Sequence, residues 1–149
     1  MQKRETAVEN RLRTLRVMWL AMLSNVVIFF LISVFAFNAP SESSANVTLT
    51  IALLVLGTLF VVISFPLKQR VHKLAVEQQK IDLVQTGFVL AWAVCEVAAL
   101  LGMLDRFLSN DRYYFVLFLI SAAGMAMHFP RRDHLLAATY KTSSKGSAF

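Results

Sequence analysis

Four stretches of the chain carry almost no charge and are long enough to cross a bilayer. They are residues 17–37, 47–67, 84–104 and 113–130, and the only charged residue within them is Glu96. A helix needs about 20 apolar residues to cross the hydrocarbon core of a membrane. The stretch 47–67 is rich in β-branched residues, but an uncharged run of this length favours a helix over a strand. The pattern predicts an all-α, single-domain integral membrane four-helix bundle.

The Lys and Arg residues are concentrated in three of the segments outside these stretches. The N-terminal flank 1–16 has five, the loop 68–82 has four and the tail 131–149 has four, whereas the other two connections together have two. Because short cytoplasmic segments hold the excess of Lys and Arg, both termini and the loop are predicted to be cytoplasmic. The candidate anchors at the two membrane interfaces are Arg16, Lys68, Arg70, Arg131, Arg132, Tyr113 and Tyr114.

Within the loop 68–82, apolar residues recur at helical spacing, so we expect the second or third helix to continue beyond the membrane surface. The tail 131–149 is rich in Ser, Thr and Lys towards its end and is expected to be mobile. An uncleaved first span behind a basic flank is expected, because 21 apolar residues are more than a signal peptide carries.

Composition narrows the function classes. The chain is 57% hydrophobic and 16% charged, with a mean hydropathy of +0.60, whereas soluble domains are about 25% charged. The net charge of +6 comes from residues that flank apolar runs, which indicates anionic lipid rather than nucleic acid as the counter-charge. No spacing of His, Cys or carboxylates predicts a metal site or cofactor, and no nucleophile and base are arranged as in an enzyme.

Two hairpins of the chain resemble each other weakly. Phe65-Pro66-Leu67-Lys68 and Phe129-Pro130-Arg131-Arg132 both follow an apolar run, at an offset of 64 residues. With a gap in the first outer connection, Asn25 falls opposite Glu96 and Ser24 falls opposite Cys95. Such parallel repeats occur in some transport proteins, although transmembrane helices also resemble one another through composition alone. The bundle is therefore a candidate pair of pseudo-repeated hairpins.

Glu96 is the residue with the clearest chemical interest. It lies near the middle of the third span, where an ionisable group costs a few kcal/mol and is expected to face protein or a wet cavity. Three roles are open: an interhelical hydrogen bond, with Asn25 and Ser24 as the first candidate partners; proton or ion handling; or a contact between subunits. Next to it lies a strip of small residues that favours close helix packing. The strip comprises Ala91, Cys95, Ala98 and Gly102.

The sequence around Glu96 resembles two groups of proteins. Residues 92–102, Trp-Ala-Val-Cys-Glu-Val-Ala-Ala-Leu-Leu-Gly, resemble the carboxylate helix of the proteolipid (c-type) subunits of rotary ATPases, which implies that Glu96 binds a proton. The Ala-x-x-Glu-x-x-Ala-Leu-x-Gly pattern and the basic ends of the spans are also similar to uncharacterised small bacterial four-span membrane proteins. This second resemblance implies the bacterial cytoplasmic membrane. Proteolipid rings need a Gly-rich helix, and 17–37 contains no Gly, so the first resemblance does not imply a rotor subunit.

Two functions follow as hypotheses. The first is a non-enzymatic structural or accessory membrane protein that packs in or alongside a larger membrane complex or forms a homo-oligomer. The second is a proton- or ion-handling membrane protein that uses Glu96. The first predicts that Glu96→Gln is tolerated, and the second predicts that it abolishes activity.

Overall fold

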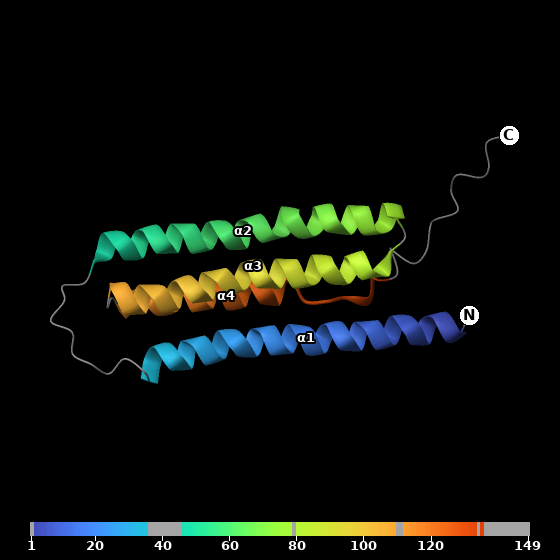
Figure 1. Cartoon of the computed structure of the whole chain (residues 1–149), viewed down its shortest axis with the longest axis horizontal. Coiled ribbons are helices and arrows are strands. Elements are labelled where there is room, and N and C mark those ends of the chain that lie inside the picture. The colour runs from blue at the N-terminus through green and yellow to red at the C-terminus, as the bar shows by residue number, and fades with distance from the viewer. Residues whose placement is uncertain (1, 36–45, 79, 110–111, 134, 136–149) are drawn as a thin grey trace.

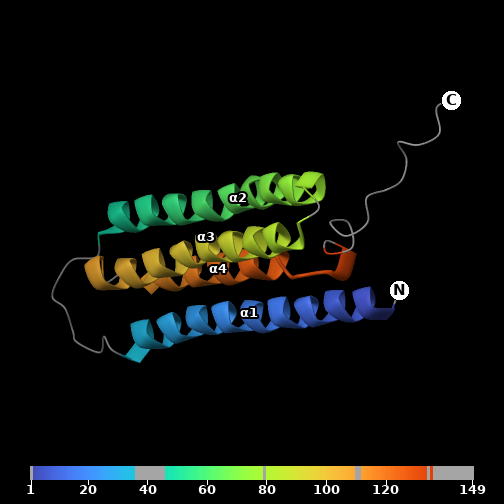
Figure 2. The same cartoon turned by 45° about the vertical axis from the view of Figure 1, so that its right-hand side comes forward.

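The chain folds into four helices and no strand within the residues that the structure, a computed structural model, describes: 2–35, 46–78, 80–109, 112–133 and 135. The helices are α1 (Gln2–Phe35), α2 (Val47–Gln78), α3 (Ile81–Leu108) and α4 (Phe115–Met127), with a 3-10 turn, η1 (Arg112–Tyr114), before α4. They run side by side along one axis in alternating directions (Figures 1 and 2). The predicted all-α bundle is confirmed.

The two ends of the bundle differ in what they contain. The start of α1, the end of α2, the start of α3 and residues 128–133 lie at one end, which we call the inner end (Figure 1). The end of α3, the start of α2 and η1 lie at the opposite, outer end. The described parts of the three segments in which the sequence concentrates Lys and Arg therefore meet at the inner end.

Three helices, α1, α2 and α3, are long and apolar enough to cross a membrane. With 34, 32 and 28 residues, they are longer than the roughly 20 residues that a bilayer requires. Large apolar side chains along α1 and α2 face outwards, among them Ile28, Leu31, Val55 and Leu59. Exposed apolar side chains over the middle of a bundle are suited to lipid, so the arrangement is compatible with a membrane protein.

The helices extend well beyond the expected spans at the inner end. The flank 1–16 is helical from Gln2, α2 continues past residue 67 to Gln78, and α3 already begins at Ile81. The backbone N–H of Lys80 donates to the Ala75 carbonyl oxygen at 3.1 Å and so closes the end of α2. The expected continuation of a helix into 68–82 is therefore present, and it involves both helices.

The fourth span differs from the expected range 113–130, because its α-helix contains only 13 residues and ends at Met127. Pro130 cannot continue a helix, and it disfavours helical backbone in the residue before it. The indole N–H groups of Trp19 and Trp92 then donate to the carbonyl oxygens of Met125 and His128, at 2.9 and 3.2 Å. The Trp92 bond gives the His128 carbonyl, at the helix end, a partner, and the Met125 carbonyl accepts from Trp19 in addition to the His128 backbone N–H. The only two tryptophans of the chain thus stabilise the end of α4.

Helix α3 is the centre of the bundle. It packs against α1, α2 and α4, whereas α1 and α2 share no extensive contact among the described residues. In the most apolar window of each helix, 44% of the α3 residues are buried, against 28% for α2 and 11% for α1. The two halves of the chain therefore pack differently: α3 and α4 form a close pair, and α1 and α2 lie on either side of them (Figure 1).

The apolar core has two parts. One, in the middle of the bundle, contains Val26, Val61, Ala98 and Phe118. The other, at the inner end, contains Leu15, Phe88 and Trp92 together with Leu135. Most of the tail 131–149, which was expected to be mobile, lies outside the described residues.

Candidate functional site

Glu96 lies on the boundary between the buried and exposed faces of α3. One helical turn away, Trp92 and Ala99 are fully buried, whereas Ala93 and Leu100 are exposed. The Glu96 side chain itself is partly exposed. Among the described residues, no hydrogen bond or ion pair reaches its carboxylate. The protein chain therefore shields this group only in part.

The structure does not join Glu96 to the two residues first considered as its partners. Asn25 is exposed on α1. The Ser24 hydroxyl donates to the Leu20 carbonyl oxygen of its own helix at 2.8 Å. A hydroxyl that bonds the carbonyl of the preceding turn needs no partner from a second helix. The expected interhelical bond is thus absent among the described residues.

The small residues next to Glu96 lie at the seam between α3 and its neighbours. Ala91, Cys95, Ala98 and Gly102 are all buried. Two glycines of the facing helices approach this strip closely. A Cβ atom at Gly124 of α4 would lie 3.0 Å from Cys95 Sγ and 2.8 Å from Val61 Cγ1, and one at Gly57 of α2 would collide with Leu117. Small side chains on three helices therefore permit the close packing at the centre of the bundle.

A second acidic residue of α3, Asp105, is completely buried near the outer end. Its Oδ1 atom accepts hydrogen bonds from the hydroxyls of Thr50 and Ser109, at 2.9 and 2.5 Å. The two hydroxyl oxygens are 3.0 Å apart. Thr50 comes from α2, so this buried polar cluster, Thr50–Asp105–Ser109, links two helices.

The buried polar cluster has one acceptor that the described residues leave unused. The second carboxylate oxygen, Oδ2 of Asp105, is buried without a hydrogen-bond partner among them. Buried carboxylate oxygens usually have partners, so this atom can accept a proton donor or a cation. Sequence reasoning assigned Asp105 to the outer connection and missed the cluster. A signal was present, because Asp105 and Ser109 continue the strip Ala91, Cys95, Ala98, Gly102 by steps of three and four residues.

A second polar cluster lies nearer the inner end and joins α2 to the end of α4. Ser64 Oγ is 2.7 Å from His128 Nε2, and the Cys95 thiol contacts the same hydroxyl oxygen at 3.5 Å. All three side chains are buried. The Ser64 hydroxyl also lies 2.6 Å from the Val61 carbonyl oxygen. In one His128 tautomer Nε2–H donates to Ser64 and Ser64 donates to this carbonyl, and in the other tautomer Ser64 donates to Nε2. In both cases a buried hydrogen bond joins α2 to the end of α4.

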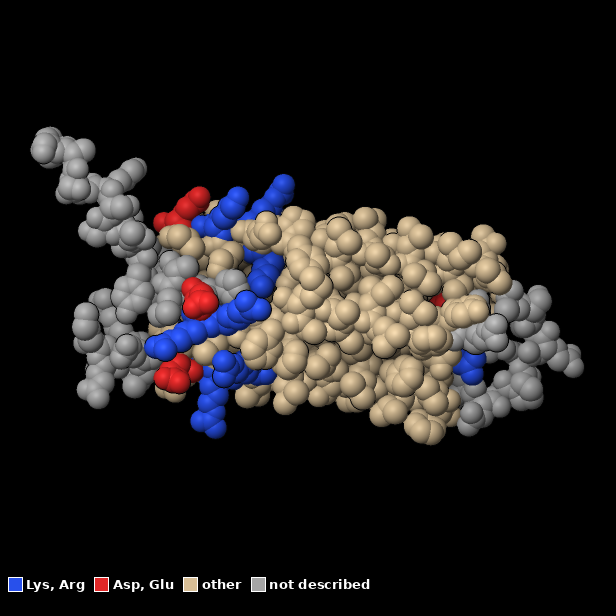
Figure 3. Space-filling model, turned by 180° about the vertical axis from the view of Figure 1, so that it is seen from behind, with Lys and Arg blue, Asp and Glu red and all other residues tan. Residues whose placement is uncertain are grey.

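The predicted interface anchors contact aromatic rings at both ends. The Arg16 guanidinium lies 5.7 Å from the centre of the Phe129 ring, and Lys68 Nζ lies 4.2 Å from that of Phe88. At the outer end, Arg106 lies over Tyr114 at 5.2 Å. Figure 3 shows the Lys and Arg side chains as a band at the inner end of a long uncharged surface. This distribution is typical of side chains at a membrane interface.

Other predicted anchors face outwards. Arg70, Arg131 and Arg132 are exposed, and Tyr113 is 49% exposed. Exposed basic side chains at the inner end of the bundle can reach lipid headgroups.

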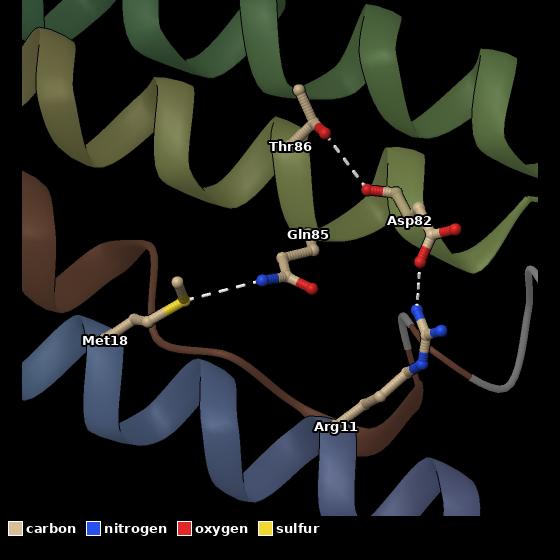
Figure 4. A network of polar contacts seen from close by, with 5 residues as sticks. All are labelled: Arg11, Met18, Asp82, Gln85 and Thr86. Atoms are coloured by element: carbon tan, nitrogen blue, oxygen red, sulfur yellow. Dashed lines mark hydrogen bonds and ion pairs between the residues drawn. The ribbon is translucent and has the colours of Figure 1, made fainter.

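Among the described residues, the side-chain polar contacts between α1 and α3 lie towards the inner end (Figure 4). Arg11 forms an ion pair with Asp82, and the Gln85 amide approaches the Met18 sulfur at 3.5 Å. Both members of the ion pair are well exposed, so it adds little stability. A shallow groove of about 430 Å³ begins at Asp82 and runs along α3, where its lining includes Val89, Leu90 and Ala93. The groove ends one helical turn before Glu96.

The comparisons with known proteins add no relative. No protein-family model, curated protein or solved structure matches the chain. Within the described part of the chain, no three His, Cys, Asp or Glu side chains gather as metal ligands. The function must therefore be argued from the geometry of the bundle.

Proposed function

We propose that the protein is a non-enzymatic accessory subunit that packs in or alongside a larger complex of the bacterial cytoplasmic membrane, with both termini in the cytoplasm. The observation that carries this proposal is the partly exposed Glu96 at mid-span. The single-chain bundle supplies no described partner to its carboxylate.

The cost of that arrangement in lipid supports a contact with another chain. A carboxyl group at the centre of a bilayer costs a few kcal/mol unless it faces protein or water. Helix contacts in membranes are stabilised by interhelical hydrogen bonds and by small residues. A donor from a neighbouring protein would lower the cost at Glu96 and would bind only in one orientation.

The surface next to Glu96 contains a groove against which a helix of a neighbouring protein could pack. The groove lined by Val89, Leu90 and Ala93 lies on the same side of α3. Leu100, one turn beyond Glu96, is 41% exposed. An apolar stripe interrupted by one carboxyl group would let a partner helix pack closely and bond to Glu96.

The experiment compares complexes released from the membrane in mild detergent and measured by native mass spectrometry. We would purify tagged wild type, Glu96→Gln, Glu96→Leu and, as a control, Thr58→Val. Thr58 is also exposed at mid-span, but its hydroxyl bonds to the Leu54 carbonyl oxygen of its own helix.

We expect wild type and Thr58→Val to remain in one defined complex, because neither loses a bond to a partner. Glu96→Gln retains a hydrogen-bonding group and should keep most of that complex. Glu96→Leu should leave the bundle folded, but the complex with the partner should dissociate. Equal recovery of the complex with Glu96→Leu, or a wild-type protein that is monomeric under all mild conditions, would contradict the proposal.

Proton or ion handling is a second candidate, favoured by the unpartnered Oδ2 of buried Asp105 in addition to Glu96. About 13 Å of helix separates the two residues at 1.5 Å per residue. Purified protein in liposomes would be tested for proton flux. Flux in wild type that is lost in both Asp105→Asn and Glu96→Gln would support this candidate, and absence of flux in wild type would remove it.

A further inference from the structure

We propose that a pocket beside Lys68, at the inner end of the bundle, binds the phosphate of an anionic phospholipid. The pocket has a volume of about 190 Å³ and lies between α2 and the end of α4. Its lining combines Phe65 and Met127 with the polar side chains of Lys68, Gln69, His72 and His128. This inference does not depend on the proposed accessory role.

The pocket carries positive charge that the described residues do not neutralise. Lys68 is partly buried, and among the described residues it forms no ion pair with a carboxylate. Its Nζ instead lies over the Phe88 ring at 4.2 Å. Burial, and to a smaller extent the positive charge of Arg131, lowers the pKa of Lys68 from its ordinary value, and an anion beside Lys68 would offset both effects. Two neighbouring cations without an acid form a site that favours an anion.

The position of the pocket favours an anion that belongs to a lipid. Its lining residue Lys68 belongs to the basic residues of the inner end, where Lys and Arg side chains form a band beside the long uncharged surface (Figure 3). Ile63, on the membrane side of Phe65, is 45% exposed, and Met127 at the pocket rim is 70% exposed. A lipid could place its phosphate against Lys68 and Gln69 and its acyl chains along these apolar side chains. Basic pockets between helices at the cytoplasmic interface bind lipid headgroups in this way.

Phe65 of the first Phe-Pro motif and the residues at the end of α4 build this pocket together. Phe65 packs against the His128 ring with 4.5 Å between the ring centres, and Ser64 bonds to His128. The last residue of α4, Met127, and the residue that follows it, His128, both line the pocket. The pocket therefore depends on the early end of α4.

The test measures the thermal stability and lipid retention of full-length protein that has been delipidated in detergent. The probes are palmitoyl-oleoyl phosphatidylglycerol, the matching phosphatidylcholine and inorganic phosphate. The variants are Lys68→Gln and the control Arg70→Gln, which removes the same charge two residues away at an exposed position.

We expect phosphatidylglycerol to raise the melting temperature and to remain bound in native mass spectra of wild type and Arg70→Gln. Lys68→Gln should bind it about fivefold more weakly, as is typical for loss of one basic residue at a lipid surface. Phosphatidylcholine and inorganic phosphate should have little effect.

Three results would overturn the proposal. Equal losses in Lys68→Gln and Arg70→Gln would show general charge attraction rather than a pocket. Equal stabilisation by inorganic phosphate would indicate a site for a free anion. No difference between phosphatidylglycerol and phosphatidylcholine would exclude recognition of a negative headgroup. Should Lys68→Gln fold poorly, Arg131→Gln provides the same comparison, because Arg131 is exposed.

Discussion

The middle and the outer end of α3 each carry one acidic residue, and their surroundings are opposite. Glu96 is partly exposed and has no described partner, whereas Asp105 is fully buried and accepts hydrogen bonds from Thr50 and Ser109. The middle of α3 packs through small side chains, and its outer end is joined to α2 by polar groups. Burial of an acid in this bundle therefore depends on which face of the helix it occupies, and not on its depth in the span.

Removal of each carboxyl group should separate the two regions most clearly. We expect Asp105→Ala to lower the free energy of unfolding by about 2–3 kcal/mol, because two buried hydroxyls lose the carboxylate oxygen that links α2 to α3. Ser109 keeps the Asp105 backbone carbonyl as an acceptor, and Thr50 keeps Ser109 Oγ. Glu96→Ala should change it by less than about 0.5 kcal/mol, since no described group loses a bond. Unfolding of the dissociated protein in detergent, followed by circular dichroism during titration with sodium dodecyl sulfate, would measure both. Similar losses in the two variants would mean that Glu96 has a partner within the chain.

A smaller loss in the free energy of unfolding is expected when the close packing beside Glu96 is disturbed. Gly124→Ala would place a Cβ atom within 3.0 Å of Val61 Cγ1 and Cys95 Sγ, and overpacking of this kind costs about 1–2 kcal/mol. Ala123→Val, an exposed change on the same helix, is the control and should have little effect. The same detergent titration applies. A stabilised Gly124→Ala would show that α4 can shift away from α3 and that the seam is loosely packed.

The contribution of a single hydrogen bond to the buried polar cluster at the outer end can be measured by removing the hydroxyl of Thr50. Thr50→Val keeps the shape of the side chain and should cost about 1 kcal/mol, the usual value of one buried hydrogen bond. In an Asp105→Ala background the same change should cost less, because the carboxylate acceptor is already gone and Thr50 keeps only Ser109 Oγ, at 3.0 Å. Additive losses in the double variant would show that Thr50 stabilises α2 independently of Asp105.

The sequence predicts the helices better than it predicts their contacts. Uncharged runs and basic flanks identify all four helices, because membrane insertion depends on composition over about 20 residues. The early end of α4 was not predicted, since the same Phe-Pro pair lies inside α2 at Pro66 and after α4 at Pro130. The end of α4 accepts bonds from Trp19 and Trp92, which come from distant segments that the local sequence does not report.

The candidate site shows the same limit. Glu96 stood out because it is the only charge in its span, but charge alone does not report which neighbour faces it. The pairing with Asn25 assumed that the two hairpins pack alike, and they do not. The buried face of α3 could be read from the spacing of its small residues, and extending that spacing would have found Asp105 and Ser109. Thr50 could not be placed opposite them without the structure.

The smallest expected effect concerns hydroxyl groups that bond only within their own helix. It tests whether the contribution of a polar group to the free energy of unfolding depends on its hydrogen-bond partner or on its depth in the membrane. Ser24 and Thr58 are exposed and donate to the carbonyl oxygens of Leu20 and Leu54 on their own helices, both at 2.8 Å. Ser24→Ala and Thr58→Val should each change the free energy of unfolding by less than about 0.5 kcal/mol, because the backbone carbonyl keeps its helical hydrogen bond. Thr50→Val, measured in the same titration, provides the reference for a hydroxyl that bonds across helices. If Thr58→Val cost as much as Thr50→Val, the depth of a hydroxyl would matter more than its partner, and the contrast between Glu96 and Asp105 would need a different explanation.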